Sequence, residues 1–168
     1  HSGLGSSPFS ISYWFNSVRA DNNMESEIVL YKSDGTTKLY YIDFTNSQTD
    51  MTIRIYNDAG GSVIEYFDTN ITQGWNHYIA SFSASSGMST SATLWKNGSL
   101  VSKNTSNGGP GGSAGTIGHL KVDLEDSCAI QDLILWSTPF TGSEAVTQLY
   151  NNGNWKHPST HASASSII

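Results

Sequence analysis

Short runs in which apolar and polar residues alternate restrict the fold of this 168-residue sequence more than any other feature. Phe9, Ile11, Tyr13 and Phe15 are each separated by one residue, and serines fill the first two gaps. Successive side chains of a β-strand point to opposite faces of a sheet, so this spacing predicts a strand with one buried face. Comparable runs bounded by turn residues recur along the chain. The strands that we expect are residues 9–16, 27–32, 39–44, 51–56, 62–67, 75–83, 93–96, 99–103, 116–120 and 128–136.

Turn and helix signals complete the fold prediction. Asn97–Gly98 stands between two strand-like runs, and both residues readily adopt positive φ, which predicts a tight hairpin. Thr141 and Glu144 fit a helix capping box, and apolar residues follow at helical spacing up to Tyr150. Many short strands with a single helix predict an all-β fold. We expect a two-sheet antiparallel jelly-roll sandwich with one short C-terminal helix.

The domain prediction follows the same pattern. Strand signals continue on both sides of the Gly-, Ser- and Asn-rich residues 104–115, so we interpret that stretch as a surface loop. After Trp155 the composition changes to Ser, Ala and His. The prediction is one domain over residues 1–156, followed by a polar tail or inter-domain linker over residues 157–168.

Composition excludes several classes of partner. Charged residues are only 13% of the chain, and the net charge is −6. No basic patch is visible, which argues against a nucleic-acid partner. No apolar run approaches the roughly 20 residues of a membrane-spanning helix, so we expect no membrane insertion. Ser, Thr and Asn make up about a third of the chain, and such residues suit turns and hydrogen-bonding surfaces.

Four stretches, taken in order, resemble the laminin-G-like jelly-roll domains, which belong with the concanavalin A-like lectins and the pentraxins. The stretches are FSISYWF at 9–15, GWNHYIA at 74–80, LWKNGSLV at 94–101, and AIQDLILW at 129–136 with LYNNG at 149–153 after the helix. The resemblance implies the same jelly-roll sandwich. It says little about a ligand, because this fold hosts many functions.

The sequence lacks the catalytic patterns of the relatives that act on glycans. Hydrolases of this group carry a Glu-x-Asp-x-Glu strand, whose spacing places two carboxylates on one face, and no such strand occurs here. The Gln-x-His strand of the lyase relatives is absent, and so are Gly-x-Ser-x-Gly and His-Glu-x-x-His motifs. His77 and Cys128 are expected to be structural residues. We therefore predict that the protein is not an enzyme.

A calcium site is suggested by the pentraxin relatives, which bind the ion with acidic loops before two strands. This sequence has acidic and amide residues before the strands expected at 27–32 and 128–136, and calcium prefers such oxygen ligands. The ligands that the resemblance implies are Asp21, Asn22, Asp123 and Asp126, with Glu125 in reserve. The other interpretation is two solvated acidic loops, and the sequence leaves both open.

The first functional hypothesis is a non-catalytic binding or adhesion module that recognises glycans or a protein surface. Sugar recognition needs an aromatic side chain that stacks on a sugar face, and Trp155, Trp95 and Trp14 are the candidates. For Trp14 and Trp95, which lie on expected strands, a position in the core is the alternative. Trp155 follows the helix and either is exposed or packs on it.

Two further hypotheses belong to other classes. In the first, the chain is a structural or decoration module of a larger tandem-domain surface protein or a bacteriophage virion, since residues 157–168 look like an inter-domain joint. In the second, the chain is an unusual glycan hydrolase or lyase. The resemblance implies an extracellular, cell-surface or virion location and a larger multidomain or assembled protein.

Overall fold

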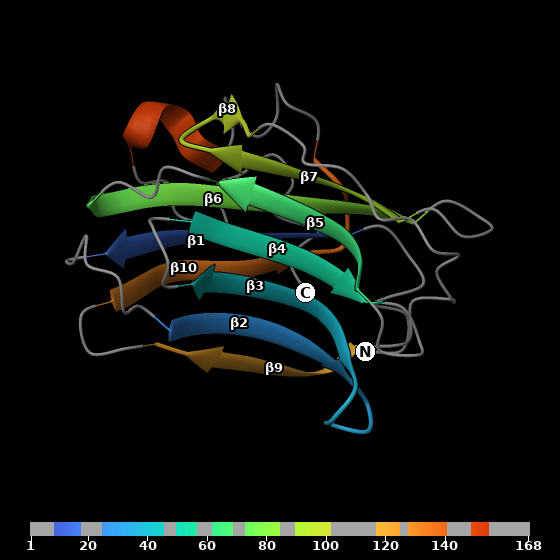
Figure 1. Cartoon of the computed structure of the whole chain (residues 1–168). Coiled ribbons are helices and arrows are strands. Elements are labelled where there is room, and N and C mark those ends of the chain that lie inside the picture. The colour runs from blue at the N-terminus through green and yellow to red at the C-terminus, as the bar shows by residue number, and fades with distance from the viewer. Residues whose placement is uncertain are drawn as a thin grey trace.

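In the computed structural model the chain forms two antiparallel sheets of five strands each (Figure 1). One sheet has the order β10-β1-β6-β7-β8, and the other has the order β5-β4-β3-β2-β9. The structure describes residues 9–17, 25–45, 50–56, 62–68, 73–84, 90–101, 117–124, 128–140 and 149–154. The strands are β1 (Phe9–Ser17), β2 (Glu25–Lys32), β3 (Lys38–Thr45), β4 (Asp50–Tyr56), β5 (Ser62–Asp68), β6 (Gly74–Ala84), β7 (Thr90–Lys96), β8 (Ser99–Leu100), β9 (Ile117–Asp123) and β10 (Cys128–Trp136). The predicted all-β, two-sheet sandwich is confirmed.

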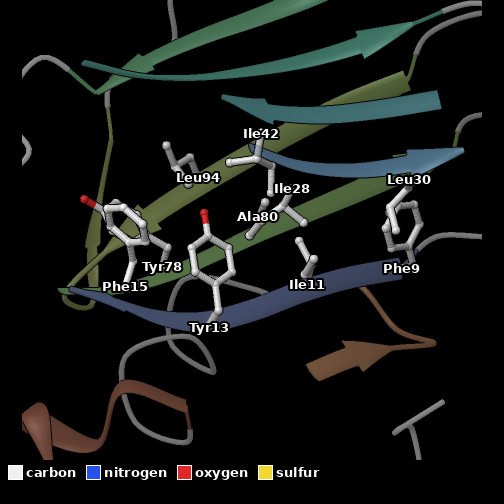
Figure 2. Close-up of a cluster of buried hydrophobic side chains, with 10 residues drawn as sticks. All are labelled: Phe9, Ile11, Tyr13, Phe15, Ile28, Leu30, Ile42, Tyr78, Ala80 and Leu94. Carbon is white, nitrogen blue, oxygen red and sulfur yellow. The ribbon is translucent and has the colours of Figure 1, made fainter. Parts of the chain in front are cut away.

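The main core lies between the two sheets. The four alternating apolar residues of β1 are fully buried there, as their spacing predicts. Residues of β2, β3, β6 and β7 point toward them from both sheets, and Figure 2 shows this cluster. The Tyr13 and Tyr78 rings stack with their centroids 5.7 Å apart. Period-two alternation therefore explains the inner layer of the sandwich.

A second cluster covers the outer face of the sheet that contains β1. It consists of Ile79, Trp95, Trp136, Phe140 and Leu149. The segment after β10 brings Phe140 over this face, where its backbone N–H lies 2.9 Å from Ser81 Oγ and 3.2 Å from Ser10 Oγ. Ser12 Oγ accepts a hydrogen bond from Trp136 Nε1 at 2.8 Å. Ser10 and Ser12 therefore do not face solvent, although alternation suggests it; they satisfy polar groups of a buried layer.

The predicted hairpin turn is confirmed. Asn97 and Gly98 have φ values of 49° and 76°, which fit the tight turn between β7 and β8. A second turn, between β2 and β3, contains Gly35 with φ of 72°. Asp34 there accepts hydrogen bonds from the Thr37 hydroxyl and from the backbone N–H groups of Thr37 and Thr36. These bonds hold the pKa of Asp34 well below its usual value, because they favour the charged carboxylate.

Several strand bounds differ from the prediction. Strand β7 begins at Thr90, three residues before its expected start at Thr93. Strand β9 continues three residues past the expected end at Leu120, since it pairs with β2 as far as Glu27 opposite Asp123. Asp123 is therefore a strand residue and not a loop residue. Most of the predicted helix, residues 141–148, lies outside the described residues, as does the tail at 157–168. The described end of that segment is helical at 149–150 and forms the 3-10 turn η2 (Asn151–Gly153).

Candidate functional site

An open hollow of about 220 Å³ lies on the outer face of the sheet that contains β1. Its lining residues are Trp14, Trp75, Gln131 and Gly153. We call this feature the tryptophan hollow. None of these four residues carries a charge.

Strand register brings the lining residues together. Trp14 lies opposite His77 of β6 on one side and opposite Gln131 of β10 on the other. Trp75 is two residues before His77, so both side chains belong to the same face of β6. Neighbouring strands are about 4.8 Å apart. The row of Gln131, Trp14 and His77 crosses three strands, and Trp75 lies on the same face one pair further along β6. The two tryptophans and the Gln131 amide therefore surround one space.

A β-bulge in β10 sets the position of Gln131. Ser12 pairs with Ile134, but Trp14 pairs with Gln131, so β10 has one residue more than β1 in this stretch. Asp132, within the bulge, has φ of 52°. A bulge re-aims side chains and increases the local twist. Here it leaves Gln131 exposed beside Trp14, and the Gln131 amide nitrogen lies 3.4 Å from Asp132 Oδ2.

Aromatic packing holds Trp14 in place beneath the hollow. The Trp14 ring centroid is 4.8 Å from that of His77 and 6.1 Å from that of Tyr150. The His77 and Tyr150 rings are 6.1 Å apart and stacked. His77 is only 4% exposed, in line with its predicted structural role. The three rings form a rigid base, because each aromatic pair adds to the packing of the others.

Trp75 differs from these rings because 46% of it is exposed. It follows Gly74, whose φ of 93° allows the chain to turn into β6. Tyr78, three residues later on the same strand, is fully buried, whereas Trp75 is not. The position of Trp75 near the start of β6 was the only sequence signal that its ring is exposed.

The three tryptophans predicted from the sequence have different positions. Trp14 lines the tryptophan hollow and is half-buried. Trp95 is 6% exposed and packs with the Trp136 cluster, which favours the core alternative for this residue. Trp155 lies outside the described residues. The structure thus brings one predicted tryptophan to the hollow and adds Trp75, which the sequence reasoning missed.

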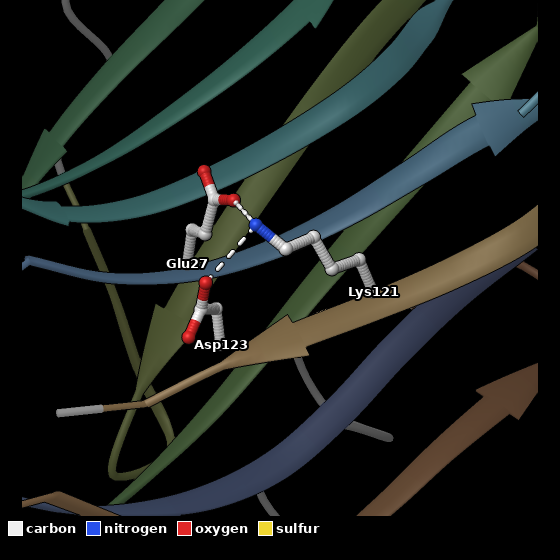
Figure 3. A network of polar contacts seen from close by, with 3 residues as sticks. All are labelled: Glu27, Lys121 and Asp123. Atoms are coloured by element: carbon white, nitrogen blue, oxygen red, sulfur yellow. Dashed lines mark hydrogen bonds and ion pairs between the residues drawn. The ribbon is translucent and has the colours of Figure 1, made fainter. Parts of the chain in front are cut away.

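The calcium hypothesis stays a prediction. Asp21, Asn22, Glu125 and Asp126 lie outside the described residues. Asp123 forms an ion pair with Lys121 at 3.0 Å, and Lys121 also pairs with Glu27 (Figure 3). The hydrogen bond to Glu27 raises the pKa of Lys121 above its usual value, and the hydrogen bond to Asp123 adds to this effect. Within the described part of the chain, no three His, Cys, Asp or Glu side chains gather as a metal site.

Asn97 ties the β7–β8 turn to the strand that carries Trp75. Its Oδ1 accepts the His77 backbone N–H at 2.8 Å, and its Nδ2 donates to Asn76 Oδ1 at 2.9 Å. The Asn97 backbone N–H also donates to the His77 carbonyl. These contacts fix the start of β6, and with it the hollow.

Replacing Asn97 by Ala is expected to lower the free energy of unfolding by about 2–3 kcal/mol. The variant loses both side-chain hydrogen bonds, and Ala tolerates the left-handed region less well than Asn does. Asn97→Gly loses the same bonds but tolerates positive φ, so it is expected to cost about 1 kcal/mol less than Asn97→Ala. Urea unfolding of both variants measures this difference. Equal losses would contradict the role given to backbone conformation.

Comparison with known proteins identifies a fold and no family. No family model matches the sequence, and no curated protein matches it. Solved structures of toxin binding domains do resemble it. One, from work on the interaction of botulinum neurotoxin type C with two ganglioside molecules, has a TM-score of 0.66 at 12% identity over 89% of this chain and 36% of that chain.

Two further structures extend this comparison. The binding domain of botulinum neurotoxin DC in complex with rat synaptotagmin II has a TM-score of 0.66 at 10% identity, over 89% of this chain and 37% of that chain. The binding domain of Paraclostridial Mosquitocidal Protein 1 has a TM-score of 0.57 at 16% identity, over 88% and 37% of the two chains. The chain therefore spans little more than a third of each of these structures. At such identities the likeness shows a shared fold.

Among the residues that the structure describes, no helix has the length and apolar character to cross a bilayer.

Proposed function

We propose that this protein is a non-catalytic binding module that recognises a neutral carbohydrate in the tryptophan hollow. The observation that carries the proposal is the pairing of the half-exposed Trp75 ring with the half-buried Trp14 ring and the exposed Gln131 amide. A sugar ring has an apolar C–H face and hydroxyl groups at its edge. An aromatic surface suits the face, and an amide can both donate to and accept from the hydroxyls.

The size and charge of the hollow favour one class of sugar. A volume of about 220 Å³ is below that of most pockets for drug-sized molecules, so one sugar ring fits while the rest of a glycan stays in solvent. Among the described residues of the lining none is cationic, so these residues offer no counter-charge to a sulfated or phosphorylated sugar. The proposal is therefore an uncharged terminal or internal sugar residue.

The solved structures lend support at the level of fold. One of the similar toxin binding domains interacts with gangliosides, and another is in complex with synaptotagmin II. This two-sheet sandwich thus occurs in proteins that bind glycolipids and protein receptors. The proposal extends to an extracellular or cell-surface module of a larger protein, in keeping with the laminin-G-like resemblance and with the greater length of the similar chains.

The test is a glycan array run with calcium and with a chelator, followed by calorimetric titration of the best glycan. Trp75→Ala is expected to weaken that binding about five- to tenfold, since an aromatic contact of this kind contributes about 1–1.5 kcal/mol. Gln131→Ala is expected to weaken it as well, because the hydroxyl contact is lost. A dependence on calcium would support the calcium hypothesis, and equal binding in chelator would count against it.

Leu100→Ala is the matched control. Leu100 is a large apolar residue with 65% exposure on β8, and it does not line the hollow. Its replacement is expected to leave glycan binding unchanged. Glycan binding that survives Trp75→Ala and Gln131→Ala would contradict the assignment of the hollow. Release of a cleaved product from any glycan would contradict a non-catalytic module.

A further inference from the structure

Strand β9 presents apolar side chains at the open edge of its sheet. It pairs with β2 on one side and is the last strand of the sheet order (Figure 1). Every residue from Gly118 to Asp123 is exposed. Leu120 and Val122 are 43% and 40% exposed, two of the four large apolar side chains that are exposed in the described part of the chain. An edge strand of this kind offers unpaired backbone groups to another strand.

Charge normally protects such an edge, but here it is balanced. Lys121 is the only cation of β9 besides the titratable His119, and it pairs with Glu27 and Asp123 (Figure 3). A lysine on an edge strand usually discourages pairing through its free charge. The two carboxylates offset that charge here. The exposed edge of β9 is therefore apolar, with one positive residue, Lys121, and one negative residue, Asp123.

The order of residues on β9 is self-complementary. Residues 120–124 read Leu-Lys-Val-Asp-Leu, which is symmetric about Val122 except that the charges are opposite. If two such strands run antiparallel with Val122 opposite Val122, then each Lys121 lies opposite Asp123 of the other copy. Leu120 then lies opposite Leu124, which packs partly against the main core. Opposite charges and apolar pairs at facing positions both stabilise a sheet.

We propose that β9 pairs with β9 of a second copy of this chain, antiparallel, with the twofold axis at Val122. The two five-stranded sheets would then join into one continuous sheet. A twofold interface requires a self-complementary surface, which this charge pattern provides. Moving the centre to Lys121 would place two lysines opposite each other, and like charges at facing positions destabilise a sheet.

Sedimentation velocity at rising protein concentration tests the dimer, in chelator so that no metal ion contributes. The chain is expected to shift from monomer to dimer. Val122→Lys places two like charges at the axis and is expected to weaken dimerisation about 100-fold or more. Leu100→Lys is the control, since it adds the same charge at an exposed apolar position on β8, at the end of the other sheet. It is expected to leave the dimer intact.

Charge reversal tests the register. Lys121→Glu alone and Asp123→Lys alone each place like charges at facing positions, so each variant is expected to be monomeric. Mixed in equal amounts, the two variants have opposite charges at both facing positions and are expected to dimerise with each other. Circular dichroism shows that each variant is folded. A wild-type chain that stays monomeric, or a mixture that stays monomeric while the wild type dimerises, would overturn the proposal.

Discussion

Replacing Trp136 by Ala is expected to lower the free energy of unfolding by about 3–5 kcal/mol, the cost of removing a large buried aromatic residue. Trp136 is fully buried in the outer cluster, where its ring lies edge-on to Phe140 at 5.2 Å between centroids. The substitution leaves a cavity between β10 and the segment after β10 that carries Phe140. It also removes the N–H donor that bonds to Ser12 Oγ. Urea unfolding followed by circular dichroism measures the loss.

Two matched variants separate the causes of this loss. Trp136→Phe keeps an aromatic ring and removes the indole N–H, so it is expected to cost clearly less than Trp136→Ala. Trp75→Ala removes a half-exposed tryptophan that belongs to neither buried cluster of the described residues, and it is expected to change stability by less than about 1 kcal/mol. If Trp136→Ala cost no more than Trp75→Ala, the outer cluster would not be a packed layer.

The inner layer of the sandwich could be predicted because it depends on local spacing alone. Phe9 to Phe15 alternate, and the fold buries that face of β1. The outer layer could not be predicted in the same way. Ser10 and Ser12 look like solvent-facing residues in the sequence. The pairing of β10 with β1 brings Trp136 beside them, and the path of the chain after β10 places Phe140 over them. Burial of a polar strand face depends on tertiary structure, and the alternation of residues along one strand does not predict it.

The tryptophan hollow was predicted only in part. Trp14 was a candidate, but its neighbours depend on register between strands that are far apart in the sequence. The bulge that exposes Gln131 contains Asp132 at positive φ, a position where glycine would have been a visible signal. The exposure of Trp75 depends on what covers the start of β6. None of these features follows from a single strand.

The acidic residues show the same limit. Asp123 was expected in a loop with free carboxylate oxygens for calcium. Its strand position places it beside Lys121 and opposite Glu27, which lies about a hundred residues earlier in the chain. Strands β2 and β9 are neighbours in the sheet but far apart in the sequence, so their cross-strand partners cannot be read from residue spacing. The β9 pattern of Leu, Lys, Val, Asp and Leu was present in the sequence, but its meaning depends on β9 being an edge strand.

Replacing Gly118 by Ala is expected to lower the free energy of unfolding by about 2–3 kcal/mol, because the added methyl group overpacks a closed contact. A β-carbon at this position would collide with Ser33 Cα and would lie 2.8 Å from the Ser33 backbone nitrogen. Backbone atoms cannot move aside as a flexible side chain can, so β9 must shift away from the turn after β2. Denaturant unfolding gives the change in stability.

A second variant shows whether backbone contact is the cause. Ser33→Gly removes only the Ser33 side chain, whereas the obstructing atoms are those of its backbone. The double variant is therefore expected to be no more stable than Gly118→Ala alone, and recovery of stability would contradict this reason. Because the shift acts on the β9 edge, Gly118→Ala is also expected to weaken dimerisation, while Asn97→Ala, on the other sheet, leaves it unchanged.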